Sequence, residues 1–174
     1  MASSWESPLE FHKDTGEPFI RLLHPHEGLV LTPPRLSDVA VLTGIMNDPK
    51  VYQTLQGPPH PYLQSHAVEW LERISRQSAD VLREYREAEI AERNGRLKKL
   101  VGACPVRYIR EIQEDGTDIL LGDIHVDRCG YPDVLDQEAK ARLVRENEAR
   151  EAGDSEIVWC IGGNQPSLLV STAV

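Results

Sequence analysis

The chain has 174 residues, of which 40% are apolar and 27% charged, and its formal net charge is −9. This length suits one domain with its own core, and the composition excludes a wholly disordered chain. The negative charge argues against a nucleic-acid or anionic-membrane partner, because either needs a basic face. The sequence shows no apolar run of membrane-spanning length and no signal-peptide pattern. Three widely spaced cysteines favour a reducing compartment, so we expect a cytoplasmic protein.

The first part of the chain predicts two short strands and a helix. Residues 1–19 are polar and contain Pro and Gly, which predicts a flexible leader. Short apolar runs predict strands at Ile20–Leu23 and Leu29–Thr32. Ser37 is the expected N-cap of the helix that follows, and Asn47-Asp48-Pro49 is its expected end.

A long amphipathic helix is predicted over Ser65–Glu92. Residues four positions apart along it predict the ion pairs Glu69–Arg73, Glu72–Arg76 and Glu89–Arg93. Before the helix, the Pro-rich segment 56–61 predicts a rigid loop. His60 in that loop is read either as a surface residue or as the border of a substrate pocket. The apolar stripe of the helix, which we expect to face the core, is Val68, Leu71, Ile74, Val81/Leu82 and Tyr85.

The second half of the chain predicts a hairpin, a helix and a last strand. Strands are expected at Leu100–Ile112 and Thr117–Asp127, joined by a turn at Glu114-Asp115-Gly116. A charged helix is expected at Asp136–Glu151, on the surface. A buried strand is expected at Glu156–Gly162.

Four segments, in this order and spacing, carry a resemblance to a known family. They are Leu29–Val39, Met46–Val51, Leu121–Ile124 and Ile157–Gly162. The chain resembles the GNAT superfamily of acyl-CoA N-acetyltransferases over residues 20–162, in the branch of ribosomal-protein and small-molecule acetyltransferases. The resemblance implies an α+β fold with a mixed, mostly antiparallel sheet and flanking helices.

The resemblance also implies a reaction, the transfer of acetyl from acetyl-CoA to the primary amine of a small molecule or peptide. In the family, the strand equivalent to the last one here lines the pantetheine arm of the cofactor, which implies cofactor contacts at Trp159, Cys160, Ile161 and Gly162.

The end of the sequence departs from the family. A pyrophosphate-binding loop of the form Gln/Arg-x-x-Gly-x-Gly/Ala should follow the lining strand, but residues 163–174 do not contain it. We therefore expect a fold that is incomplete at the C-terminus, with a divergent tail and weak or absent acetyltransferase activity. One alternative is a non-catalytic interaction module that uses the half-fold, with its acidic surface or the 136–151 helix. Another is a fragment without a function of its own.

Two residues are candidates for catalysis, His125 and Glu156. If residues 123–129 are extended, Asp123, His125, Asp127 and Cys129 share one face. This face is read as a solvated face, as a polar patch or acid/base pair beside the substrate, or, less favoured, as a metal site. Glu156 could remove a proton from the amine, although it stands at the start of its strand. No metal site is expected, and the sequence leaves the oligomeric state open.

Overall fold

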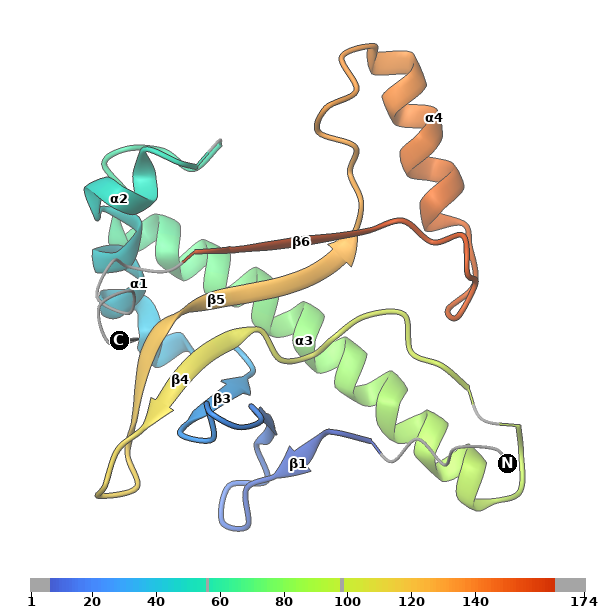
Figure 1. Ribbon diagram of the computed structural model, residues 1–174, viewed down its shortest axis with the longest axis horizontal. Helices are drawn as coiled ribbons and strands as arrows, with labels where there is room; N and C mark the ends of the chain where they lie inside the picture. Colours follow the sequence, from blue (N-terminus) through green and yellow to red (C-terminus); the bar gives the residue numbers. More distant parts are fainter. Residues whose placement is uncertain (1–6, 56, 98, 165–174) are drawn as a thin grey trace. The chain divides into compact units, whose positions relative to one another are not determined.

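The structure is a computed structural model that describes residues 7–55, 57–97 and 99–164. Figure 1 shows the helices and strands. In chain order they are β1 (Glu10–Phe11), β2 (Pro18–Arg21), β3 (Leu29–Thr32), the 3-10 helix η1 (Leu36–Asp38), α1 (Val39–Met46), α2 (Pro49–Tyr52), α3 (Gln64–Arg93), β4 (Tyr108–Ile112), β5 (Asp118–Arg128), α4 (Gln137–Glu148) and β6 (Trp159–Asn164).

The strands form one open sheet in the order β1-β2-β3-β4-β5-β6, and each of the first five pairs antiparallel with its neighbour. A register shift interrupts the β4–β5 ladder between Ile109 and Arg110. The predicted turn between these strands is confirmed, with Gly116 at a positive φ of 83°. The mixed α+β class is therefore confirmed, in the form of an antiparallel sheet with helices.

Strand β6 runs antiparallel to β5. The Cys129 N–H donates to the Val158 carbonyl at 2.8 Å, whereas Gly162, four residues further along β6, lies against His125, four residues earlier on β5. Residue numbers that rise along one strand while they fall along the other indicate an antiparallel ladder.

The described residues divide into two compact units, and each is described by itself. Unit 1 contains residues up to 78, with 105–124 and 163–164, and unit 2 contains 79–104 and 125–162. The chain leaves unit 1 at Ser78 and returns at Pro105, and the Ser78 hydroxyl donates to the Pro105 carbonyl at 2.6 Å. It leaves again after Ile124 and returns at Gly163, whose backbone lies against Asp123 and Ile124.

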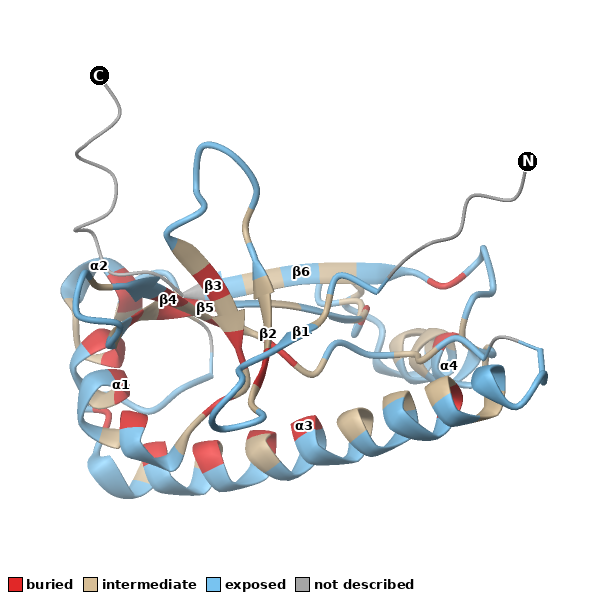
Figure 2. Cartoon of the chain, turned by 90° about the horizontal axis from the view of Figure 1, so that it is seen from below, coloured by how far each residue is buried: buried red, intermediate tan, exposed pale blue. Residues whose placement is uncertain are grey.

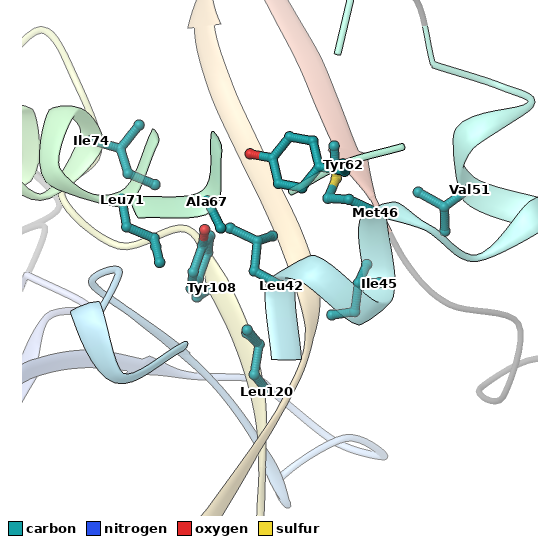
Figure 3. Close-up of a cluster of buried hydrophobic side chains, with 10 residues drawn as sticks. All are labelled: Leu42, Ile45, Met46, Val51, Tyr62, Ala67, Leu71, Ile74, Tyr108 and Leu120. Atoms are coloured by element: carbon teal, nitrogen blue, oxygen red, sulfur yellow. The ribbon is translucent and has the colours of Figure 1, made fainter. Parts of the chain in front are cut away.

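The core of unit 1 lies between the sheet and the helices α1 and α3. Buried residues of α3 follow the side of the helix that faces the sheet (Figure 2). Figure 3 shows the cluster, which consists of Leu42, Ile45, Met46, Val51, Tyr62, Ala67, Leu71, Ile74, Tyr108 and Leu120.

The Asn47 side chain fixes the approach to α3. Its Nδ2 donates to the Tyr62 carbonyl at 2.7 Å, and its Oδ1 accepts from the Tyr62 N–H at 2.9 Å. Nδ2 also donates to the Thr43 carbonyl at the end of α1. The Asn47 amide thus pairs with both backbone groups of Tyr62, as a neighbouring strand would, and it connects the loop before α3 to α1.

A network of alternating charges holds the other end of unit 1. Arg110 is 2% exposed, and it donates to Asp38 at 2.5 Å and to Asp118 at 3.2 Å. Arg35 joins Asp118 to Glu17, at 2.8 Å and 2.7 Å. The network links the chain before β2, the turn after β3 and the β4–β5 hairpin.

Unit 2 contains a second asparagine bridge. The buried Asn147 side chain of α4 donates to the Val158 carbonyl at 2.8 Å and accepts from the Val158 N–H at 2.9 Å. Arg128 donates to the carbonyls of Asn147 and Arg150, which caps the end of α4. These contacts fix the chain that leads into β6.

Several local predictions are wrong. Ser37 is not the N-cap of α1, because η1 precedes the helix and Asp38 takes the cap position. Residues 100–107 form no strand, and β4 begins only after Pro105, which lacks an N–H to donate. Val68 is 38% exposed instead of facing the core. The last strand begins at Trp159 instead of Glu156, and it is not buried as predicted, since Trp159 and Ile161 are exposed.

Further predictions agree with the structure, agree in part or fall outside it. The long helix is confirmed within one residue at each end, and the charged helix is confirmed within one residue at its start and three at its end. Residues 1–6 of the expected leader and 165–174 of the expected tail lie outside the described residues, whereas residues 10–11 and 18–21 form strands. The domain boundaries stay a prediction.

Candidate functional site

The candidate site is a cavity of about 750 Å³ in unit 1. It lies between α1, the loop before α3, the first turns of α3 and the sheet. β4 and β5 each contribute one polar side chain, and spacings of three and four residues bring several side chains of α3 to the cavity. Its lining residues are Leu42, Met46, Gly57, Pro58, Pro59, Tyr62, His66, Glu69, Trp70, Arg73, Tyr108 and Asp123.

The buried end of the cavity, which we call the floor, consists of Tyr108 and Asp123. These residues are direct partners across β4 and β5 and are 1% and 9% exposed. Arg107 donates to the Asp123 carboxylate at 3.1 Å, so the buried charge is compensated. The hydroxyl of Tyr108 is buried, and within the described part of the chain it has no hydrogen-bond partner of good geometry. Such a group calls for a ligand atom or water.

The Tyr108 hydroxyl stays protonated at neutral pH. Burial raises the pKa of Tyr108, the negative charge of Asp123 raises it further, and the neighbouring Trp70 indole lowers it. Tyr108 can therefore donate a hydrogen bond, while Asp123 beside it can only accept when ionised.

Trp70 forms one wall of the cavity, and two guanidinium groups lie over its ring. Those of Arg73 and Arg107 are 4.5 Å and 5.7 Å from the ring centroid. Both distances are within the range of cation–π attraction. The indole thus orders both cations around the cavity.

Glu69 and Arg73 are exposed residues that line the outer part of the cavity, which we call the mouth. The predicted Glu69–Arg73 ion pair is absent from the salt bridges of the described residues, and Arg73 stacks on Trp70 instead. Burial raises the pKa of Tyr62, the Arg73 charge lowers it, and the Glu69 charge raises it. Both charges therefore act on the Tyr62 phenol, which lies between mouth and floor.

The loop before α3 covers one side of the cavity with Gly57, Pro58 and Pro59. His60 does not line the cavity, and its ring stacks on Tyr52 at 4.1 Å between centroids. Tyr62 is held by the Asn47 bridge described above.

Of the predicted polar face on β5, the structure places Asp123 in the cavity. The His125 side chain is partly exposed in unit 2, with its Nε2 at 3.8 Å from the Asp127 carboxylate. His125 thus stays a candidate without a shown role. The described residues contain no group of three or more side chains arranged to hold a metal ion.

The predicted cofactor residues of β6 lie in unit 2. Arg128 lies over the Trp159 ring at 5.9 Å, and Ile161 is exposed. A hydrogen bond with Cys129 raises the pKa of Cys160, which argues against a reactive thiolate there. A Cβ on Gly162 would lie 2.6 Å from the His125 ring.

Sequence reasoning did not single out Gly163, the residue of β6 that lies next to the cavity. A Cβ at this position would lie 2.4 Å from the Asp123 carbonyl oxygen, so only glycine allows this approach of the strands.

Glu156 precedes β6 in unit 2 and is exposed. Its carboxylate accepts from the Arg150 guanidinium at 2.6 Å. Its role as a base therefore stays a prediction.

The residues of the α3 wall were missed for a definable reason. His66, Glu69, Trp70 and Arg73 recur at helical spacing, but the pattern was read only for its apolar stripe. Trp70 lies in a row of polar residues beside the apolar stripe. An aromatic residue in such a place is the signal that could have indicated these cavity residues.

Comparison of the chain with protein-family models, with curated proteins and with solved structures gives no match. None of the helices of the described residues is long and apolar enough to cross a membrane.

Proposed function

We propose that the chain is an acetyl-CoA-dependent N-acetyltransferase of the GNAT type, and that the cavity of unit 1 binds the primary amine that accepts the acetyl group. One observation carries this proposal: a buried carboxylate, Asp123, lies beside the Tyr108 hydroxyl, which has no hydrogen-bond partner of good geometry among the described residues, at the end of a cavity with apolar and aromatic walls. A cationic amine fits such a site, because the carboxylate can accept its N–H groups in addition to those of Arg107 and aromatic rings contact its alkyl part.

The proposed reaction is direct attack. The ammonium first loses a proton to solvent, and the neutral nitrogen forms a bond to the thioester carbonyl carbon. The carbon–sulfur bond then breaks to release the thiolate, the nitrogen loses its second proton to solvent, and the thiolate takes up a proton from solvent. Asp123 and Tyr108 orient the amine before attack, so positioning supplies most of the catalysis.

Acetyl-CoA supplies the activated acetyl group. The residues of β6 fit its pantetheine arm in one respect, since β6 is the last strand of the described sheet and its outer edge has no partner strand there. Backbone groups along Trp159–Gly162 would pair with the pantetheine amides. Gly163 would keep the end of this strand close to Asp123.

The test is calorimetric titration of the full chain with acetyl-CoA, followed by measurement of thiol release in the presence of primary amines. We expect heat on titration, and amine-dependent thiol release that Asp123→Asn reduces at least tenfold. Asp127→Asn, an exposed carboxylate on the same strand, serves as the control and should leave the rate unchanged. Equal rates for the two variants would argue against the assigned pocket.

A second candidate function is an interaction module, and the exposed apolar side chains of unit 2 favour it. Trp159 and Ile161 on β6 and Val126 on β5 are all exposed. The absence of heat at millimolar acetyl-CoA, with a chain that still unfolds cooperatively, would support this function over the enzymatic one. The cytoplasmic location inferred from the cysteines remains part of the proposal.

A further inference from the structure

The mouth of the cavity presents two opposite charges that do not neutralise each other. Glu69 and Arg73 are one helical turn apart on α3, where side chains stand about 5–6 Å apart at Cβ. Such neighbours usually pair, but the Arg73 guanidinium lies over the Trp70 ring at 4.5 Å. Both charged groups remain available to a ligand that carries the complementary pair.

We infer that the cavity binds a free diamino acid, whose α-ammonium and α-carboxylate groups contact Glu69 and Arg73 at the mouth and whose terminal side-chain amine reaches Asp123 and Tyr108 at the floor. This inference rests on the proposed function, and it names the class of acceptor.

The head group of an amino acid matches the mouth in charge and spacing. Its ammonium and carboxylate are attached to one carbon, so they present a cation and an anion a few ångströms apart. A guanidinium that is already ordered by an aromatic ring binds a carboxylate with less loss of side-chain entropy.

The floor selects the other end of the ligand. The Asp123 carboxylate, which Arg107 contacts at 3.1 Å, has acceptor sites for a further donor, and the Tyr108 hydroxyl calls for a polar partner. A terminal ammonium satisfies both, since it has three donors and becomes an acceptor once deprotonated. Figure 3 shows both tyrosines of the cavity, with Tyr108 rising from β4 beside α1 and Tyr62 at the start of α3.

The walls between mouth and floor suit an alkyl chain. Leu42, Met46 and the Tyr62 ring line this part, and the cavity volume of about 750 Å³ exceeds that of a single amino acid. A chain of methylene groups gains affinity there by leaving water.

The test is calorimetry on the full chain with four probes: lysine, cadaverine, norleucine, and lysine blocked at its α-amino and α-carboxyl groups. Cadaverine lacks the carboxylate, norleucine lacks the terminal amine, and blocked lysine lacks both head-group charges. We expect lysine to bind about tenfold or more tightly than each of the other three, as loss of one charge-assisted contact implies.

Two variants assign the contacts. Arg73→Gln should reduce the affinity for lysine about tenfold and leave that for cadaverine unchanged, and Asp123→Asn should weaken both. The matched control is Arg76→Gln, which alters the neighbouring exposed arginine of α3, whose guanidinium donates to the Glu72 carbonyl at 3.1 Å. This control should leave all four affinities as they are.

The outcomes separate the two proposals. Equal affinity for lysine and blocked lysine, or an equal effect of Arg73→Gln and Arg76→Gln, would overturn the inference. Amine-dependent thiol release with cadaverine as good as with lysine would also overturn it, while supporting acetyl transfer. Selective lysine binding without acetyl-CoA binding would support the inference and contradict the transfer.

Discussion

Asn47 binds both backbone groups of Tyr62, with its amide donating at 2.7 Å and accepting at 2.9 Å. This single side chain positions a residue that belongs at once to the core and to the cavity. The position of the loop before α3 therefore depends on this side-chain contact and not on hydrogen bonds of the sheet.

Replacing Asn47 with Ala should lower the free energy of unfolding by about 1–3 kcal/mol, because two backbone groups of Tyr62 lose their partners. Urea denaturation measures the effect. Asn94→Ala, beyond the end of α3, is the control and should change stability by less than about 0.5 kcal/mol. Similar losses for both variants would show that the bridge contributes little.

Replacing Arg110 with Met should cost about 3–5 kcal/mol, because the buried Asp38 would lose its cation, whereas Asp118 would keep Arg35. Arg21→Met removes an exposed arginine, 3.9 Å from Glu10, and should cost less than about 1 kcal/mol. The double change Arg110→Met with Asp38→Asn should recover part of the loss. A double variant no more stable than the single one would contradict the charge argument.

The pKa values of Tyr62 and Tyr108 are both raised in the folded chain, mainly by burial. Because an unfolded tyrosine ionises near pH 10, their contribution is complete below about pH 10 and is lost as the pH rises above it. The unfolding free energy should therefore fall as the pH rises above about 10. Tyr108→Phe should reduce this fall and leave stability at neutral pH unchanged or higher, since among the described residues the hydroxyl has no hydrogen-bond partner of good geometry. A fall of the same size in Tyr108→Phe would refute the assignment.

Two glycines should respond in opposite ways to alanine. At Gly163 the new methyl group would lie 2.4 Å from the Asp123 carbonyl oxygen, so we expect a loss of about 1–3 kcal/mol. At Gly44, in the exposed middle of α1, nothing lies within 4 Å, and Ala should add about 0.5–1 kcal/mol. Thermal unfolding of the two variants gives the comparison. A neutral Gly163→Ala would show that β6 moves freely away from β5.

The order of helices and strands could be predicted because each has a local cause. Asp136 begins α4 by accepting from the Ala139 N–H, and Gly116 supplies the turn of the hairpin. The start of β4 was missed because a strand begins where its partner is, and the partner, β3, lies about eighty residues earlier in the chain.

The candidate site was harder to predict because its parts are joined only by folding. Asp123 was noticed for its alternation with His125, but Tyr108 becomes its partner only through the β4–β5 register. Arg73 was assigned to Glu69 by spacing alone, and only the position of Trp70 shows that it does otherwise. The sequence pattern of one helix or strand shows which of its residues share a face. It does not show which residues of another element that face contacts.

The bond between Ser78 and Pro105 has a consequence for the evolution and engineering of this chain. The segment between them departs and returns at a single point, and so does the segment between Ile124 and Gly163. Both segments are therefore insertions in the geometric sense. Shortening, lengthening or exchanging them should leave the residues at their ends, Ser78 with Pro105 and Ile124 with Gly163, in place in unit 1. Every residue that lines the cavity lies outside the two insertions, so such an exchange would leave the cavity and its charged residues in place.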